Sequence, residues 1–236
     1  MLELVTLPPA FGMRNVSPFC LKIEMLLASL ELEFTLSELT DPRKAPKGKL
    51  PSLIADGRKI PDSELITEYL DSLTGGKVFA GLSAQQKGQG YALTRLAEDH
   101  LYWLMVASRW LDDDWWPNVV QGFFGSLPFF LRPIASGLAR RQVAQTYQLH
   151  GLGRHSLEQQ KGFARRDLEA LAGTVPSGGF LFGGQPTIFD FSVAGLMAGV
   201  YDNQPATWVT ALALEHAGLR DYTERVQQAV GVWGRK

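Results

Sequence analysis

The sequence is poor in cysteine, in net charge and in uninterrupted apolar runs. Cys20 is the one cysteine among 236 residues, which excludes an intramolecular disulfide framework and predicts a reducing, cytoplasmic location. The formal net charge is −1, and no basic stripe, zinc-finger spacing or helix-turn-helix pattern is present, so no nucleic-acid partner is expected. The first residues lack the charged and apolar regions of a signal peptide.

The most apolar stretch, residues 115–138, is broken too often to predict a membrane span. Pro117, Pro128 and Pro133 interrupt it, and Arg132 adds a charge. A membrane-spanning helix needs about 20 consecutive apolar residues. We therefore expect a buried or pocket-lining segment. An apolar ligand pocket, a dimer interface and ordinary core packing are all open explanations of its many aromatic residues.

Residues 1–74 alternate between strand and helix patterns, which predicts an α/β domain. Helices are expected to begin at Pro18 and Ser63, and short strands are expected at residues 2–7, 33–36, 52–55 and 58–60. The dipeptide Asp56-Gly57 suits the tight turn of a hairpin between the last two strands. The order βαβ then ββα predicts a sheet with one parallel strand pair and an antiparallel edge.

Residues 84–236 carry only helical patterns, so we expect an all-helical domain after a linker at residues 75–83. Apolar residues recur at helical spacing in residues 84–111, 156–172, 187–200 and 215–230. The third of these stretches is apolar nearly all round, which predicts a buried central helix. Thr187 and Asp190 match a capping box at its start.

The beginning of the first predicted helix could stabilise a thiolate. Ser17 stands at the cap position and Pro18 at the first helical position. The unpaired N–H groups and the positive dipole end of a helix favour an anion, and a hydroxyl can donate a hydrogen bond to it. Helix capping alone is the simpler explanation of this pair. Cys20 lies one turn further along and is expected to face the core.

Two further motifs could hold the ends of a peptide ligand. In Lys49-Leu50-Pro51, a proline before a short strand must lie at the strand's first residue or at a sheet edge, and a cis bond there would turn the preceding backbone towards a ligand. At the second helix start, the N–H groups and hydroxyl of Ser63 could hold a carboxylate, and Asp62 could hold an ammonium group. Capping is again the alternative.

These motifs, in this order and spacing, resemble the glutathione transferase superfamily over nearly the whole chain. The resemblance implies a thioredoxin-like domain followed by an all-helical glutathione-transferase C-terminal domain. It also implies that Ser17 is catalytic and that Leu50-Pro51 is a cis-proline step pairing with the cysteinyl part of glutathione. Lys49 matches a basic residue that meets the glycine carboxylate. Asp62-Ser63 matches the pair that binds the γ-glutamyl end.

More narrowly, the chain resembles the bacterial branch related to metaxins and failed-axon-connections proteins, whose functions are poorly defined. The residues behind this resemblance are 9–12, 17–20, 41–51, 101–103, 109–110 and 151–155. A redox branch of the superfamily has Cys-Pro-x-Cys where this chain has Ser17-Pro18-Phe19-Cys20. Because the exposed nucleophile is missing, dithiol exchange is not expected.

The helical domain is expected to supply the pocket for the second substrate. The candidates from this domain are Tyr102, Trp103, Arg109, Arg154 and His155, and Phe11 of the first domain is a further candidate. Tyr102 and Arg109 are seven residues apart and share a helix face. Arg109 could pair with a carboxylate of glutathione or of an acidic substrate, and a surface ion pair with Asp112 or Asp113 is the alternative.

The histidines allow few assignments. His155 follows the glycine-rich run before residue 156, where it could serve as an acid–base group or simply lie in solvent. His100 and His150 lack further ligands at suitable spacing, so no metal site is expected.

The resulting hypothesis is a glutathione S-transferase that uses glutathione as co-substrate and attacks a hydrophobic electrophile, as in detoxification. A non-catalytic, metaxin-like adaptor protein is one alternative, and a glutathione-dependent peroxidase or reductase is another. The family resemblance also implies a homodimer.

Overall fold

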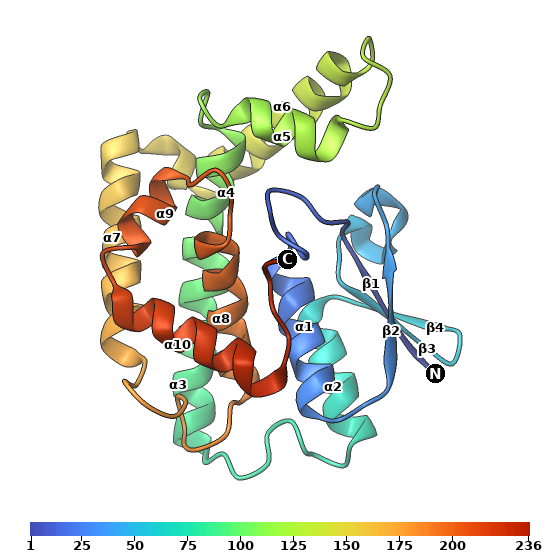
Figure 1. Ribbon diagram of the computed structural model, residues 1–236, viewed down its shortest axis with the longest axis vertical. Helices are drawn as coiled ribbons and strands as arrows, with labels where there is room; N and C mark the ends of the chain where they lie inside the picture. The colour runs from blue at the N-terminus through green and yellow to red at the C-terminus, as the bar shows by residue number, and fades with distance from the viewer.

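The computed structural model describes all 236 residues and separates a small sheet from a bundle of helices (Figure 1). All the strands lie before residue 62, and two helices accompany them. The strands are β1 (Leu2–Thr6), β2 (Phe34–Glu38), β3 (Ser52–Ala55) and β4 (Arg58–Pro61), and the helices are α1 (Pro18–Ser29) and α2 (Ser63–Leu73). The predicted βαβ-ββα order is therefore confirmed.

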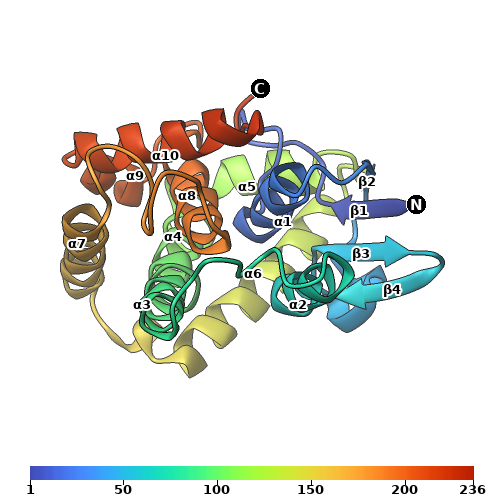
Figure 2. The ribbon, with the colours of Figure 1, turned by 90° about the horizontal axis from the view of Figure 1, so that it is seen from below.

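The four strands form one mixed sheet in the order β2-β1-β3-β4. Strand β1 runs parallel to β2 and antiparallel to β3, and β3 and β4 form the predicted hairpin. Asp56 and Gly57 both have positive φ, as the tight turn requires. Helices α1 and α2 lie between the sheet and the helical bundle (Figure 2), so the start of each helix lies near the boundary between the two parts.

The second part of the chain is entirely helical. Its elements are α3 (Ala84–Arg95), the π-helical segment η3 (Leu96–Leu101), α4 (Tyr102–Trp110), α5 (Trp116–Phe124), α6 (Arg132–His150), α7 (Leu157–Thr174), α8 (Ile188–Tyr201), α9 (Trp208–Ala213) and α10 (Ala217–Val230). The helix expected over 84–111 is thus three segments, because a π turn interrupts the regular α-helical hydrogen bonding. Three short 3₁₀ turns complete the chain: η1 (Pro42–Lys44), η2 (Pro46–Gly48) and η4 (Leu152–Arg154).

Helix α8 is the buried central helix that the sequence predicts. All its residues from 188 to 200 are buried, and it packs against α1 and α10. Gly195 makes the approach to α1 possible, because a Cβ at this position would lie 2.9 Å from the Pro18 carbonyl oxygen. This contact fixes the first turn of α1, next to Ser17, against the helical domain.

The aromatic segment 115–138 divides into α5, a turn and the start of α6. The expectation that it is buried or lines a pocket is correct for Trp115, which is 5% exposed. It is wrong for Phe129 and Phe130 in the turn, which are 81% and 60% exposed. Pro117 and Pro133 lie in the first turns of α5 and α6, and the turn between the two helices projects from the body of the molecule (Figure 1). No helix combines the length and apolar character needed to cross a membrane.

Candidate active site

A cleft of about 710 Å³ lies between the sheet domain and the helical domain. Its walls come from the start of α1, the segment before β3, the start of α2, and the η3–α4 stretch. Nine of the residues singled out from the sequence line it: Ser17, Lys49, Leu50, Pro51, Asp62, Ser63, Tyr102, Trp103 and Arg109. These residues come from four separate parts of the chain, so it is the fold that brings them together.

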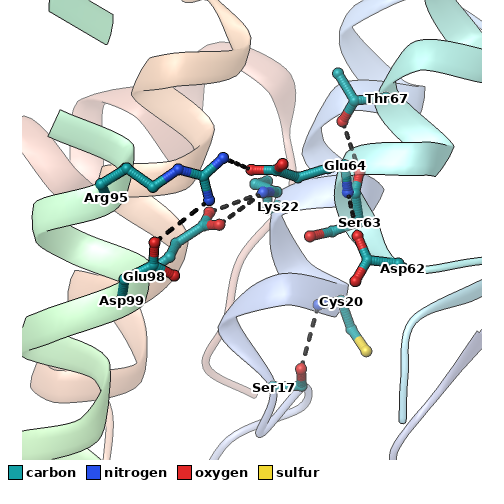
Figure 3. Close-up of polar contacts among 10 residues, drawn as sticks. All are labelled: Ser17, Cys20, Lys22, Asp62, Ser63, Glu64, Thr67, Arg95, Glu98 and Asp99. Atoms are coloured by element: carbon teal, nitrogen blue, oxygen red, sulfur yellow. Dashed lines mark hydrogen bonds and ion pairs between the residues drawn. The ribbon is translucent and has the colours of Figure 1, made fainter. Parts of the chain in front are cut away.

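Ser17 is the N-cap of α1, and its hydroxyl lies at the wall of the cleft. The Ser17 side chain is 8% exposed, and its Oγ accepts a hydrogen bond of 3.3 Å from the Cys20 backbone N–H (Figure 3). Because the oxygen is held as an acceptor, its own hydrogen stays available for another group. Capping and donation to a ligand are therefore compatible roles for this hydroxyl.

Cys20 is fully buried, as expected, and does not line the cleft. Burial raises the pKa of its thiol to about 12. A thiol with this pKa is protonated at neutral pH, and the thiol is a far weaker nucleophile than the thiolate. The structure thus separates the two ends of the Ser17–Cys20 motif, with the hydroxyl at the cleft and the thiol in the core.

The Leu50–Pro51 peptide bond is cis, and both residues line the cleft together with the exposed Lys49. The Pro51 carbonyl accepts a hydrogen bond of 3.2 Å from the Asp62 N–H. This bond holds the segment before β3 against the start of α2. Two motifs with ten residues between them in the sequence thereby become adjacent walls of one cleft.

Asp62 and Ser63 form the N-terminus of α2. Asp62 has a φ of 73°, and its Oδ1 accepts a hydrogen bond of 2.9 Å from the Glu64 N–H, so its carboxylate caps the helix. Ser63 is 6% exposed, and its carbonyl accepts a bond from the Thr67 hydroxyl (Figure 3). The Ser63 hydroxyl itself is not among the groups bonded within the protein, so it is available to a ligand in the cleft.

On the helical side, Tyr102 and Arg109 face the cleft from α4. The Tyr102 ring meets Phe19 edge-on, with 4.9 Å between the ring centroids. Burial raises the pKa of the Tyr102 phenol, which therefore keeps its proton at neutral pH. Trp103 lies beside it, with its ring centroid 5.5 Å from the imidazole of His150.

Arg109 is buried, so the surface ion pair with Asp112 or Asp113 is wrong. It is 5% exposed, and its Nη2 donates to the Gly199 carbonyl of α8. Asp113 instead binds Arg140 at 2.7 Å, and Asp112 accepts bonds from backbone N–H groups. The reason is that α4 ends at residue 110, so the aspartates leave the helix and turn to solvent.

A group of charged side chains at the cleft was not found from the sequence. Lys22 of α1 binds the Glu98 carboxylate at 2.8 and 3.0 Å, and both side chains are buried. Arg95 binds Glu64 of α2, and it also lies 3.5 Å from Asp99 (Figure 3). The i,i+4 spacing of Arg95 and Asp99 was the one local signal, because the other pairs join residues far apart in the sequence.

Three of the candidates lie outside the cleft lining. Phe11 packs behind it, with its ring 5.9 Å from the Arg109 guanidinium. Arg154 donates to the Gln148 carbonyl at 3.3 Å, and the His155 ring packs on Phe163. The structure does not bring Arg154 and His155 to the cleft, because the preceding turn holds them beside α6 and α7.

The histidines considered as metal ligands have other contacts. His100 pairs with the Asp167 carboxylate, and His150 lies 3.1 Å from the Asp99 carbonyl oxygen. No group of three or more histidine, cysteine, aspartate or glutamate side chains is arranged to hold a metal ion.

Comparisons with known proteins agree with this architecture. A family model for the glutathione S-transferase N-terminal domain matches residues 18–115. The chain is 32% identical to an isoprene-epoxide–glutathione S-transferase from Rhodococcus sp. (strain AD45), over 97% of this chain and 98% of that one. It is 30% identical over 189 residues to failed axon connections from Drosophila melanogaster, which covers 75% of this chain and 44% of the relative.

A solved structure shows the same arrangement of elements. A glutathione S-transferase from Methylobacterium radiotolerans, in complex with glutathione sulfonate, matches with a TM-score of 0.63 at 16% identity. The match covers 100% of this chain and 96% of that one. At this identity the likeness shows the shared fold, a thioredoxin-like sheet domain followed by a helical domain.

Proposed function

Because the chain belongs to the glutathione transferase superfamily, we propose that it binds glutathione in the cleft, ionises the thiol and adds the thiolate to a small, mostly apolar electrophile. One observation carries the proposal: Ser17, Leu50 and Ser63 come from separate parts of the chain and line one cleft. The Rhodococcus relative is named for an epoxide. We therefore propose epoxides as the class of electrophile.

In this proposal the three parts of glutathione meet three walls of the cleft. The γ-glutamyl carboxylate is bound by the Ser63 hydroxyl and the N–H groups at the start of α2, where the helix dipole favours an anion. The Leu50 backbone pairs with the cysteinyl part, and the exposed Lys49 meets the glycine carboxylate. The Asp62 carboxylate caps its own helix. It attracts the γ-glutamyl ammonium group through its negative charge.

The thiol then lies at the N-terminus of α1. The Ser17 hydroxyl donates to the sulfur, and the positive end of the helix favours the thiolate over the thiol. A free thiol has a pKa of about 8.5, and a lower value makes the bound form mostly ionised at neutral pH. The apolar walls supplied by Phe19, Val106 and Trp110 suit an electrophile without charge.

The first test is calorimetric titration of glutathione into the wild-type protein and the Ser63→Ala variant. Ser63 is chosen because its hydroxyl is not bonded within the protein, so its loss should leave the fold intact. We expect wild-type binding and a Kd about tenfold higher in the variant, the effect of one lost hydrogen bond to a charged group. Ser156→Ala is the matched control, since it removes a capping serine from α7, outside the cleft.

The outcome also decides between the alternatives. Absence of wild-type binding at millimolar glutathione would contradict the transferase proposal and favour the adaptor reading. Equal affinities in wild-type and Ser63→Ala proteins would contradict the assigned γ-glutamyl site. Since a peroxidase or reductase would use the same thiolate, assays with organic hydroperoxides as the second substrate separate it from a transferase.

A homodimer, a cytoplasmic location and a role in detoxification stay predictions. The exposed Phe129 and Phe130 at the turn between α5 and α6 supply apolar surface that a second copy could cover. We include the homodimer in the proposal on this ground and on the family resemblance.

A further inference from the structure

The wall of the cleft contains a buried guanidinium without an anion. Arg109 is 5% exposed, and one of its nitrogens, Nη2, donates to the Gly199 carbonyl. Its Nε is buried and has no hydrogen-bond partner. Two other basic side chains at or near the cleft form ion pairs, Lys22 with Glu98 and Arg95 with Glu64, whereas the buried Arg109 forms none.

Such an arrangement is unfavourable in the free protein. Nearly every buried polar group is hydrogen-bonded, and a buried charge usually has a partner of opposite sign. Burial lowers the pKa of Arg109 to about 10, which reflects the cost of keeping its charge in this environment. The neighbouring groups supply no anion: the Phe11 ring, 5.9 Å from the guanidinium, makes only a cation–π contact, and the Tyr102 phenol is neutral. A cost of this kind is relieved when an anion enters or forms in the cleft.

Helix packing holds the guanidinium in place. Nη2 donates to the Gly199 carbonyl and so binds the guanidinium to α8. Phe11 covers one side, and Gly122 of α5 admits the Phe11 ring, which a Cβ at that glycine would meet at 2.4 Å. A donor fixed in this way needs no reorganisation when charge appears beside it.

We propose that Arg109 binds the oxygen anion that forms when the thiolate opens an epoxide ring, and that this makes epoxides the preferred electrophiles. This inference rests on the proposed function. In the step, the sulfur–carbon bond forms while the carbon–oxygen bond of the ring breaks, and the oxygen keeps the electron pair. The negative charge therefore moves from sulfur to oxygen. The alkoxide then takes a proton from water, which balances the proton that the thiol released on ionisation.

The separate positions of the two donors motivate this division of roles. Ser17 stands at the start of α1 in the sheet domain, and Arg109 stands on α4 in the helical domain, and both line the same cleft. The thiolate exists before the reaction, and the Ser17 hydroxyl stabilises it. The localised charge on an alkoxide oxygen arises only as the ring opens, so a cation reserved for it acts on the transition state more than on the bound substrates.

The test compares Arg109→Met with the wild-type protein in two assays. The first is kcat for the addition of glutathione to 1,2-epoxybutane. The second is the pKa of bound glutathione, followed by the ultraviolet absorbance of the thiolate without a second substrate. We expect kcat to fall about 10²- to 10³-fold, as for loss of an oxyanion donor. We expect the pKa of the bound thiol to change by less than about 0.3.

Two further variants keep the test decisive. Arg109→Lys retains the charge without the planar fork and should lose about tenfold in kcat; it replaces the methionine variant if that one does not fold. Tyr102→Phe removes the neighbouring hydroxyl from the same helix face. If this variant loses the epoxide activity and Arg109→Met keeps it, the oxygen is bound by the tyrosine and the inference is overturned.

Other outcomes are equally informative. If the pKa of the bound thiol rises enough to account for the lost rate, Arg109 serves the thiolate and the inference is overturned. It is also overturned if kcat changes less than about threefold in Arg109→Met, or if the wild-type protein binds glutathione but does not open the epoxide. Failure of the wild-type protein to bind glutathione contradicts the proposed function itself, and the calorimetric titration shows this separately.

Discussion

At the scale of single residues, one hydroxyl has two tasks at the start of α1. The Ser17 oxygen accepts a hydrogen bond from the Cys20 N–H and so completes the helix cap, while the same hydroxyl can still donate its hydrogen to a ligand in the cleft. The sulfur of Cys20 lies in the core, where its raised pKa keeps it protonated. The proposed reaction therefore uses the thiol of glutathione and not that of Cys20.

We predict that Ser17→Ala lowers the rate of glutathione addition at neutral pH by about 10²-fold, as for other lost donors to an anion. Loss of a hydrogen bond to the charged form raises a pKa, so the pH of half-maximal rate should move upward, and the loss should shrink at alkaline pH. A pH–rate profile of the wild type and the variant measures both effects.

Ser17→Thr serves as the matched control for this prediction. Threonine keeps the hydroxyl and is an acceptable N-cap, so it should restore most of the rate and the original profile. Because Ser17 also caps α1, the alanine variant should be less stable by about 1 kcal/mol, which a urea titration reports. A pH profile that is identical in wild-type and alanine proteins would assign Ser17 to capping alone.

Residues of the cleft could be predicted where a local motif marks them. Ser17 and Ser63 each stand at a helix start with a recognisable cap, so the sequence predicted their positions. Lys22, Glu98 and Glu64 carry no such local signal, because their partners lie on other elements. The burial of Arg109 was also unpredictable, since it depends on the packing of α4 against α8 and on the end of α4 at residue 110.

At the scale of elements, the capped N-terminus of α8 connects this central helix to its neighbours in the helical domain. The Asp190 carboxylate is fully buried and accepts four hydrogen bonds. The donors are the Thr187 N–H and hydroxyl, the Leu181 N–H and the Tyr222 hydroxyl, at 2.7–2.8 Å. One side chain therefore joins the helix start to the preceding loop and to α10.

We predict that Asp190→Ala destabilises the protein by about 3 kcal/mol or more, because it leaves several buried donors without an acceptor. Urea unfolding followed by circular dichroism measures the change. The matched control is Ser156→Ala, which removes an exposed capping box from α7 and should cost about 1 kcal/mol. Equal costs for the two variants would mean that Asp190 acts only as a helix cap.

Elements were predictable where periodicity and end signals agree. The sequence predicted α8, because an apolar run follows a capping box, and the β3–β4 hairpin, because Asp56-Gly57 separates two short β patterns. It did not resolve the π segment η3, since one irregular turn hardly alters the spacing of apolar residues over a long helix. In the aromatic segment 115–138, apolar residues follow one another too closely to indicate where a helix ends. The structure shows that the segment contains α5 and the start of α6.

At the scale of the whole molecule, the cleft exists only if the two domains keep their relative position. Helix α1 packs on α8, and the C-terminal tail returns to the loop before α1, where the Arg14 N–H donates to the Gly234 carbonyl at 2.8 Å. The buried pair of Lys22 and Glu98 adds a polar connection between α1 and η3 at the cleft. The walls that hold both proposed substrates are thus fixed by contacts on either side.

Removing one partner of the Lys22–Glu98 pair should destabilise the protein strongly, whereas replacing both partners with apolar residues should have little effect on stability. Lys22→Met leaves a buried carboxylate unpaired, so we predict a loss of about 3–5 kcal/mol in the free energy of unfolding. The double variant Lys22→Met, Glu98→Leu removes both charges and should recover most of that loss. Urea unfolding of the wild type, the two single variants and the double variant gives the coupling energy.

The half-exposed pair of Arg95 and Glu64, which also joins the domains, provides the comparison. Arg95→Met should cost less than about 1 kcal/mol, since water replaces the lost partner. If Lys22→Met costs no more than Arg95→Met, water must reach Glu98 when its partner is gone, and the buried pair does not fix the domains. If the double variant is stable but binds glutathione more weakly, Glu98 shapes the cleft through its charge. The cycle thereby separates the contribution of these residues to the stability of the domain boundary from their contribution to glutathione binding.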